Sequence, residues 1–455
     1  MRIACVHVPQ FALQTLTRID PSLRGAPVAV VGTGSAGPLT TGAGRALHSP
    51  VVQACSRAAW SLGIRLGMTA TAANALAPGQ LRVVTGDEQL ERETVRAIAD
   101  ALLAVAGVVD VGGRVGAVGA HLAIYCEVPS KTRGTSYGER LLEVLDALGL
   151  TARIGIADDR FAAWVAASHG GTPSEERGVV SVPRGGSAAF LSPRPLSLLA
   201  ITPEVQHMLE ALGVRTLGEF AALPAPSVSR PLEADYQALA RGESGHSLRP
   251  YVPESPIREE LVISAAHSGA SAVAVLAERL ALRLAGRGRG AARLEITAFS
   301  EEGERVIPLA PGGAGGSAST PAAAPMAAMR AAASASWGHV IETPEELAEA
   351  LGRALGDQLS AAWRLRVAVL GEAVAGDLTE TAPITPSAET IDALSVVLAS
   401  TGSSGSWRLT AAAPPSATMR SERRDAHRRT RRGKQHRRGR VAELPVQPWL
   451  FADRK

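Results

Sequence analysis

The chain has 455 residues, 46% of them hydrophobic, which is enough for several domains of about 100–200 residues each, and no stretch approaches the roughly 20 consecutive apolar residues of a membrane span. Its net charge of +4 is uneven, because residues 420–440 carry ten Arg and one Lys against two acids, a net +9, while the rest carries −5. The three cysteines form no Cys-x-x-Cys pair, which supports neither a disulfide framework nor a zinc site and favours a reducing cytoplasm.

The first third of the chain alternates short apolar runs with helical patterns. We predict strands at 2–8, 26–32, 121–128 and 151–157, and helices at 87–106 and 137–149. The opening run "RIACVHV" stops at Pro9, which indicates a strand rather than a signal peptide. This order of elements around a mixed sheet is α+β and indicates a split βαβ core.

The middle of the chain is helical and is followed by a second α+β pattern. Residues 203–223 read as two short helices around "LGVRT", with a further helix near 228–242. The second pattern has predicted strands at 258–264, 292–299, 304–309 and 363–370, and helices at 270–286 and 344–362. Residues 310–336 form a low-complexity insert, and the composition beyond 376 predicts disorder because little apolar surface is available to offset the entropy of ordering.

Three segments, "RIACVHV" with "DPSLRGAPVAVVG", "SLGIRLGM" and "LGVRTLGEFAALP", resemble segments of the Y-family DNA polymerases, which copy damaged templates. "RIACVHV" followed by "DPSLRGAPVAVVG" resembles the family's first strand, connecting helix and next strand. "SLGIRLGM" (61–68) resembles its fingers, and "LGVRTLGEFAALP" resembles its thumb hairpin. The resemblance spans roughly residues 1–370. It implies a palm at 1–185 with fingers inserted at about 20–85, a helical thumb at 186–250, a little-finger-like α+β domain at 256–375, and a disordered Arg-rich tail at 376–455.

The family's reaction needs carboxylates, because two divalent metal ions about 3.5–4 Å apart activate the primer hydroxyl and steady the leaving pyrophosphate. The resemblance implies an Asp directly after "HV" of the first strand, where this chain has Pro9, with Phe11 two residues later. It implies an Asp-Glu pair about where Gly119 and Ala120 stand, and residues 111–126 contain no Asp or Glu. We therefore predict no catalytic residue, no metal ligand and no cofactor.

The family's nucleotide contacts are also altered. Arg57 and Trp60 stand where the family has a Tyr and an Arg that bind the triphosphate. Arg160 keeps a positive charge at one family lysine position, whereas Trp164 occupies another, and an apolar ring cannot bind a phosphate. Together with the missing acids, these replacements predict a polymerase-shaped body that has lost its metal site.

The sequence "QPWLF" (447–451) fits the bacterial clamp-binding pattern Gln-x-x-Leu-Phe. An extended peptide can place Leu450 and Phe451 in an apolar pocket while the Gln447 amide fixes the register by hydrogen bonds. The alternative is that this apolar segment packs back on the body of the protein.

The arginine-rich run is the strongest candidate for contact with nucleic acid, since basic side chains attract phosphate regardless of sequence. The alternative is a solvated basic tail. Residues 256–375 hold 11 basic and 13 acidic residues, so we expect DNA contacts from the tail rather than from this domain. The candidate contacts are Arg428, Arg429, Arg431, Arg432, Lys434, Arg437, Arg438 and Arg440.

Several further residues allow two interpretations. We interpret His7 as a packed core histidine rather than a ligand, and Asp158 and Asp159 as helix-capping residues rather than a metal pair. Asp110 and Glu127 fit ordinary strand-end residues. The hairpin at "LGVRT" either presents backbone amides to a DNA phosphate or only packs.

A polymerase-like body without the acids and with a clamp-binding end resembles the ImuB type of accessory protein from bacterial damage-inducible mutagenesis. That resemblance implies a cytoplasmic scaffold that bridges the β sliding clamp, a catalytic C-family (DnaE-type) polymerase and a RecA-like partner, and that meets DNA but no membrane. Two alternatives remain open. One is an active but divergent Y-family polymerase, and the other is a nucleic-acid-binding protein that acts only through its arginine tail.

Overall fold

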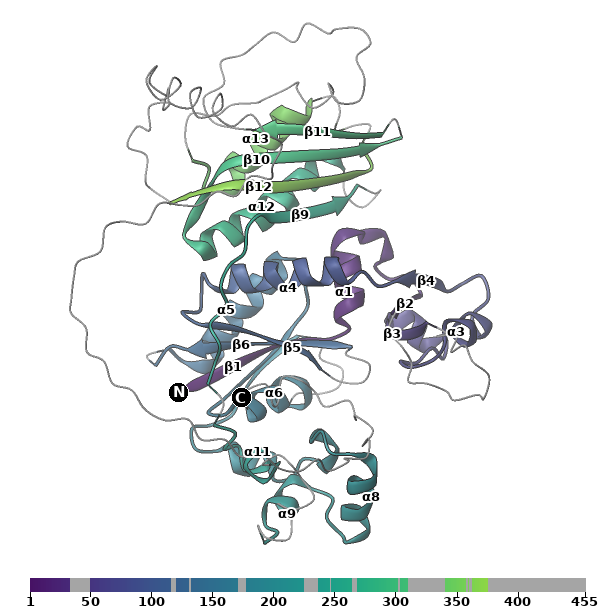
Figure 1. The fold of residues 1–455 in the computed structure, drawn as a ribbon, viewed down its shortest axis with the longest axis vertical. Helices are drawn as coiled ribbons and strands as arrows, with labels where there is room; N and C mark the ends of the chain where they lie inside the picture. Colours follow the sequence, from purple (N-terminus) through teal and green to yellow (C-terminus); the bar gives the residue numbers. More distant parts are fainter. Residues whose placement is uncertain are drawn as a thin grey trace, which may run out of the picture. The chain divides into compact units, whose positions relative to one another are not determined.

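The computed structural model describes most of the chain up to residue 374 (Figure 1). The described residues are 1–32, 50–115, 120–130, 132–170, 177–224, 236–245, 247–263, 268–301, 303–309, 340–356, 359 and 362–374. All of them fall within one compact unit. In this part of the chain no helix combines the length and the apolar character needed to cross a membrane.

A five-stranded sheet, in the order β5-β6-β1-β7-β8, lies in the segment that the resemblance assigns to the palm, and we call this sheet with its helices the palm. Its strands are β1 (Arg2–Val8), β5 (Val109–Val115), β6 (His121–Val128), β7 (Arg153–Ala157) and β8 (Gly178–Ser181). The central strand β1 pairs antiparallel with β6 and β7, whereas β7 and β8 are parallel. β-Branched and small apolar side chains favour these central strands because both faces of the sheet are covered.

Helices cover both faces of the palm sheet (Figure 1). On one face, helices α1 (Phe11–Ile19), α4 (Glu88–Leu102) and α5 (Gly134–Ala147) pack against side chains such as Val6 of β1. On the other face, α6 (Arg160–His169) packs against Ile3 and Cys5. Successive side chains of a strand point to opposite faces, so β1 contributes to both cores.

A smaller three-stranded sheet, in the order β3-β2-β4, occupies residues that the resemblance assigns to the fingers. Its elements are η1 (Pro21–Leu23), β2 (Val28–Gly32), β3 (Val51–Cys55), α2 (Arg57–Ser61), α3 (Ala70–Leu76) and β4 (Arg82–Thr85). The side chains of Ser56 and Thr69 accept hydrogen bonds from the first turns of α2 and α3, which fixes where these short helices begin.

The next segment is helical. It contains α7 (Ser187–Leu191), η3 (Leu196–Leu198), α8 (Pro203–Ala211), α9 (Leu217–Ala221) and α11 (Tyr236–Arg241). Thr216 and Glu219 form a reciprocal capping box at the start of α9. This helical segment shares a hydrophobic core with α6, so the palm and the helices support one another.

The C-terminal α+β domain has a four-stranded antiparallel sheet in the order β11-β10-β12-β9. Its elements are β9 (Ile257–Val262), α12 (Gly269–Arg287), β10 (Arg289–Ser300), β11 (Gly303–Leu309), α13 (Pro344–Leu355) and β12 (Arg364–Val374). Apolar residues of α12 and α13 join one face of this sheet in a separate core.

The predicted α+β class is confirmed, while several elements differ from those predicted. The helix predicted at 344–362 ends at Leu355, because Gly356 adopts a positive φ of 45° that ends the helix. The strands β3, β4, β5 and β8 and the short helices α2, α3 and α7 were not predicted. The helix predicted near 228–242 is described only over Tyr236–Arg241.

Candidate functional site

The end of the palm sheet at which β1 finishes is the place where the resemblance implies metal ligands. Pro9 and Gln10 form a turn there, and Gln10 has a positive φ of 47°. The Gln10 amide donates to His121 Nδ1 at 3.3 Å, and the Phe11 amide donates to the Ala120 carbonyl at 2.8 Å. Phe11 and Ala120 are fully buried. The positions near which acids were sought therefore hold a turn and two buried apolar side chains, while Gly119 lies outside the described residues.

Two histidines lie beside this turn. The His7 and His121 rings are 5.1 Å apart between centroids, and only 5% of His7 is exposed. Burial, followed by the nearby charges of His121, Arg153 and His169, lowers the pKa of His7 to about 3. Burial also lowers the pKa of His121. Both imidazoles are therefore neutral at neutral pH, and the interpretation of His7 as a core histidine is confirmed.

Asp110, the palm acid that precedes the missing pair in sequence, has other partners. Its carboxylate pairs with Arg160 Nη1 at 2.9 Å and accepts from the backbone amides of Gly112 and Arg249. Within the described residues, no group of three or more His, Cys, Asp or Glu side chains could hold a metal ion. Hard divalent cations require several oxygen ligands, which this arrangement does not offer.

The adjacent acids after β7 act as structural residues. The Asp159 side chain accepts from the amides of Phe161 and Ala162 and caps α6. The Asp158 side chain accepts from the Gly185 amide and forms an ion pair with Arg2 at 3.6 Å. The capping interpretation is therefore confirmed for Asp159 and wrong for Asp158, which is not the N-cap of α6.

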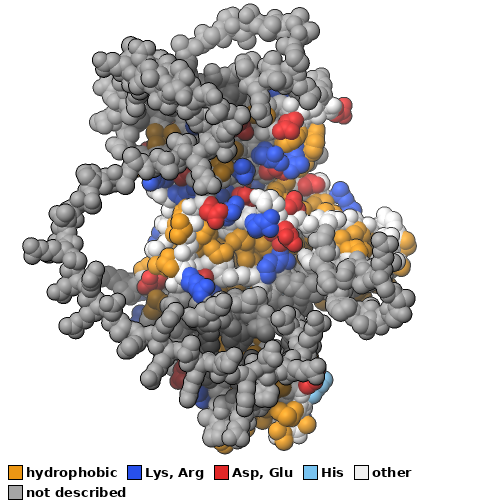
Figure 2. All heavy atoms as spheres, viewed as in Figure 1, with side chains coloured by type: hydrophobic (Ala, Val, Ile, Leu, Met, Phe, Trp, Pro, Cys, Tyr) orange, Lys and Arg blue, Asp and Glu red, His pale blue; other side chains and the backbone are white. Residues whose placement is uncertain are grey.

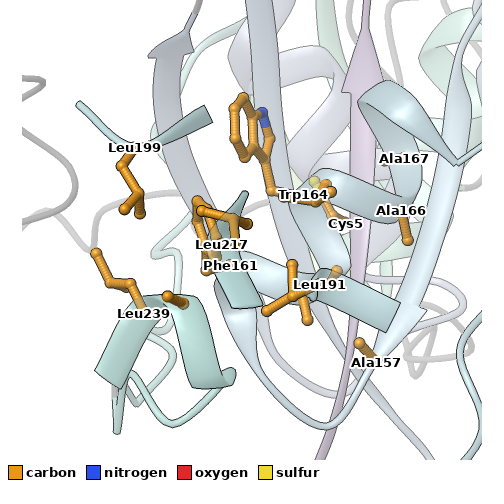
Figure 3. Close-up of a cluster of buried hydrophobic side chains, with 14 of the residues drawn as sticks. Cys5, Ala157, Phe161, Trp164, Ala166, Ala167, Leu191, Leu199, Leu217 and Leu239 are labelled. Atoms are coloured by element: carbon orange, nitrogen blue, oxygen red, sulfur yellow. The ribbon is translucent and has the colours of Figure 1, made fainter. Parts of the chain in front are cut away.

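The two side chains at family lysine positions are both buried. The Arg160 guanidinium pairs with Asp110 and stacks on the Tyr125 ring at 4.1 Å. Trp164 is 7% exposed and lies beside Phe161, with Leu217 of α9 nearby in the same hydrophobic cluster (Figure 3). A phosphate at this place would have to displace the buried Arg160–Asp110 pair and would meet the apolar face of an indole.

The short helix α2 carries an exposed aromatic ring. Trp60 is 47% exposed, and the Arg65 guanidinium lies over its ring at 4.0 Å and donates to the Trp60 carbonyl at 2.7 Å. Sequence reasoning selected Arg57 and Trp60 but not Arg65. The contact of Arg65 with the Trp60 ring depends on the turn that follows α2. Gly63 and Gly67, both with positive φ, produce that turn and were visible in "SLGIRLGM".

The helical hairpin has no spare backbone donors. The amides of Leu212, Gly213 and Val214 donate to carbonyls of α8. The amides of Arg215 and Thr216 donate to the Glu219 carboxylate at 2.8 and 2.9 Å. Because every amide from 212 to 216 has an acceptor within the protein, packing explains this hairpin better than phosphate binding does.

The face of the C-terminal sheet opposite α12 and α13 carries both signs of charge. Arg364 and Arg366 both pair with Glu260 and lie over the Phe299 ring at 5.3 and 5.2 Å. A cavity of about 850 Å³ opens along this face and is also lined by residues of α4. Figure 2 likewise shows basic and acidic side chains interspersed over the described part of the visible surface. This mixture agrees with the balanced charge counted in the sequence and differs from a basic DNA-binding field.

The predicted contacts in the tail lie outside the described residues. They include Gln447, Leu450 and Phe451 of the clamp-binding pattern and all eight basic candidates between 428 and 440. The low-complexity insert 310–336 also lies outside them. These sites stay predictions.

The first part of the chain has recognisable relatives. Residues 6–168 match the family model IMS, described as the impB/mucB/samB family. This match covers about a third of the chain. Its bounds begin within β1 and end within α6, so it contains the end of the palm sheet described above.

Longer matches connect the chain to DNA polymerases. DNA polymerase IV of Dehalococcoides mccartyi strain CBDB1 is 27% identical over 266 residues, which cover 55% of this chain and 59% of that protein. The corresponding protein of strain 195 is 28% identical over 255 residues, with the same shares covered. This chain thus spans less than two thirds of the length of the curated relatives it matches.

Solved structures give weaker likenesses. DinB from Sulfolobus solfataricus is 15% identical with a TM-score of 0.43, covering 82% of this chain and 99% of that one. An insertion ternary complex of Dbh DNA polymerase is 16% identical with a TM-score of 0.45, covering 82% and 100%.

Proposed function

We propose that this chain is a non-catalytic, polymerase-like scaffold in DNA damage tolerance and induced mutagenesis by translesion synthesis. The observation that carries the proposal is that the positions where the resemblance implies carboxylates hold Pro9 in a turn and the fully buried apolar residues Phe11 and Ala120. The IMS match and the polymerase relatives support the polymerase-like character of the body. In this proposal the scaffold acts in the cytoplasm and links the β sliding clamp to a C-family (DnaE-type) polymerase and a RecA-like partner.

Primer extension tests the non-catalytic part of the proposal. The full-length protein is incubated with a primed template, deoxynucleotides and Mg²⁺, and we expect no extension. Extension that disappears when one acid of the palm is changed, for example Asp110→Asn, would overturn the proposal, since it would show a working carboxylate site. Extension that persists unchanged in every palm acid variant would indicate a contaminating polymerase, to be removed before the result is scored.

Binding to the bacterial sliding clamp tests the tail. Leu450→Ala/Phe451→Ala removes the two apolar anchors of the clamp-binding pattern, so we expect it to abolish binding that wild type shows. The matched control is Leu444→Ala/Val446→Ala, which removes two apolar side chains of the same tail outside the pattern. Equal binding by all three proteins, or no binding by wild type, would contradict the link to the clamp.

An active but divergent Y-family polymerase is the second candidate, favoured by the named activity of the relatives. It requires three carboxylates to converge near β1. The same primer-extension experiment distinguishes the two candidates.

A further inference from the structure

The chain between α11 and β9 is fixed along the palm by three acids. We call described residues 244–245 and 247–256 the strap. The Ser244 amide donates to Asp159 Oδ2 at 2.9 Å, and the Ser244 hydroxyl donates to the same oxygen. The Arg249 amide donates to Asp110 Oδ2 at 3.0 Å. Segments that connect domains ordinarily keep their polar groups in water, whereas this one uses buried carboxylates at successive points.

The strap continues along the palm beyond Arg249. The Tyr251 amide donates to the Val109 carbonyl at 2.6 Å, and the Tyr251 hydroxyl donates to Asp100 Oδ1 at 3.0 Å. Glu254 pairs with Arg96 of α4 at 2.5 Å, although its side chain is 62% exposed. The amide of Tyr251 thus joins the strap to the edge strand β5 of the palm sheet. Its hydroxyl joins the strap to Asp100, whose side chain is fully buried.

Asp100 joins α4 to α12. Its side chain is fully buried and accepts from Arg283 Nε and Nη2 at 3.0 and 2.8 Å. It also accepts from Arg287 Nε and Nη2 at 3.0 and 2.9 Å. Together with Tyr251 these bonds satisfy both carboxylate oxygens. A buried acid with so many donors is compatible with one arrangement of the two helices only.

A second buried acid connects β9 to the palm. Glu259 accepts from Arg18 of α1 at 2.5 Å and from Arg283 Nη1 at 3.0 Å. Although burial works against its charged form, Arg18 and then Arg283 hold the pKa of Glu259 below its ordinary value. Arg283 thus bridges two buried acids, one on each side of the contact between the domains.

Close packing accompanies this network. A Cβ added to Gly286 of α12 would lie 1.9 Å from the Asp100 carbonyl oxygen, which real Cβ atoms do not approach. The absence of a side chain at Gly286 therefore lets α12 lie directly against the backbone of α4. Steric fit and charge pairing act at the same point.

We propose that the strap and the Asp100–Glu259 network hold the C-terminal α+β domain against the palm as one rigid body. Domains joined by a linker move relative to each other by default unless their interface is extensive and well packed. Here a partial separation of the domains would take arginine partners away from the fully buried Asp100 and Glu259, so intermediate orientations are strongly disfavoured. The proposal rests on the contacts alone and holds whether or not the protein is a scaffold.

Distances between spin labels in the full-length protein test the proposal. The labels are attached at Glu139→Cys on α5 and Glu349→Cys on α13, whose native side chains are 53% and 66% exposed. The three native cysteines are at most 4% exposed, so they compete little for the label. We expect a single narrow distance population in the otherwise wild-type chain. A broad or multiple distribution there would overturn the proposal.

Matched glycine variants then test the contact itself. Gly286→Ala forces α12 off the α4 backbone, and we expect the narrow population to be lost. Gly352→Ala in α13 is the control, because a Cβ there would meet nothing within 4 Å, and it should keep the wild-type distribution. Asp100→Asn, which removes the central charge without a clash, should broaden the distribution as Gly286→Ala does. If both Gly286→Ala and Asp100→Asn retain the wild-type population, the network does not fix the domain and the proposal is wrong.

Discussion

At the scale of single residues, the buried His7 makes the free energy of unfolding depend on pH in the acidic range. Its pKa is lowered from 6.5 in the unfolded chain to about 3, chiefly by burial, so the folded protein resists its protonation. Above about pH 6.5 neither state binds the proton and stability is unaffected. As the pH falls from 6.5 toward 3, the unfolded state alone takes up the proton and stability drops by about 1.4 kcal/mol per pH unit.

We therefore expect His7→Gln to flatten the loss of stability between about pH 6.5 and 4, measured as the urea midpoint at several pH values. His207→Gln removes an exposed histidine of α8 and should leave the pH dependence of wild type unchanged. Identical pH profiles for wild type and His7→Gln would show that His7 does not carry this effect.

Two buried arginines one turn apart on α12 have opposite expected roles. Arg283 bridges Asp100 and Glu259, and its replacement leaves those charges with fewer partners. Arg279 donates to the Arg18 carbonyl, but its Nε and Nη1 have no hydrogen-bond partner among the described residues. Burial, followed by the charge of Arg18, lowers the pKa of Arg279 to about 9, as expected of a poorly compensated buried cation.

Arg283→Met should therefore lower the free energy of unfolding by about 3–5 kcal/mol, the usual cost of breaking a buried ion pair. Arg279→Met should leave it within about 1 kcal/mol of wild type or raise it, since a well-packed apolar side chain replaces an uncompensated charge. Urea unfolding of the two variants at neutral pH provides the comparison. If both variants lose the same free energy of unfolding, the number of ion-pair partners of each arginine does not determine its contribution to stability.

At the scale of whole elements, the contact between α6 and β7 depends on one glycine. A Cβ on Gly155 would lie 2.1 Å from the Ala163 carbonyl oxygen and 2.3 Å from the Ala167 amide nitrogen. The helix that bears Arg160 and Trp164 thus rests directly on the strand. Any side chain at 155 must push the two elements apart.

We expect Gly155→Ala to destabilise the protein by about 1–3 kcal/mol, the range for overpacking a well-filled core. Gly178→Ala in the edge strand β8, where a Cβ meets nothing within 4 Å, is the matched control and should be close to neutral. The unfolding temperatures of the two variants, compared with wild type, test this prediction. A stable Gly155→Ala variant would indicate that α6 can shift without cost.

The same scale separates what the sequence could predict from what it could not. The helix at α12 and the strands β1 and β6 follow from strong apolar patterns, and their predicted bounds agree with the structure to within about two residues. The pattern of β5 is interrupted by Gly112 and Gly113, both with positive φ, where its pairing with β6 shifts register, so no regular alternation marked it as a strand.

The candidate site divides in the same way. The absence of acids from 111–126 and the capping role of Asp159 could be predicted from the sequence, because each depends only on residues close together in the chain. The burial of Asp100 and its pairing with Arg283 could not be predicted, since the two residues are 183 positions apart in the sequence. An acid in an amphipathic helix ordinarily faces water. The pairing of His7 with His121 likewise depends on strand register rather than on sequence distance.

At the scale of the whole molecule, charge is concentrated in the tail and balanced in the C-terminal domain. Binding to double-stranded DNA should therefore depend on residues 420–440, and deletion of that segment should weaken binding and reduce its salt dependence. Each lost phosphate contact lowers the slope of log affinity against log salt by about 0.9. Deletion of 447–451 should leave the slope unchanged. An unchanged slope after deletion of 420–440 would place the DNA contacts in the body.

The long separation between Asp100 and its partners has a consequence for synthesis on the ribosome. The palm strands are complete once β8 has emerged, yet Arg283 follows Asp100 by 183 residues. At about 5–20 residues per second, this delay lasts about 10–40 s. During that time Asp100 has no arginine partner from α12. Asp100 becomes buried only after the C-terminal domain has been synthesised and α12 has packed on α4. A residue of the N-terminal part of the chain thus reaches its final environment through residues that are made much later.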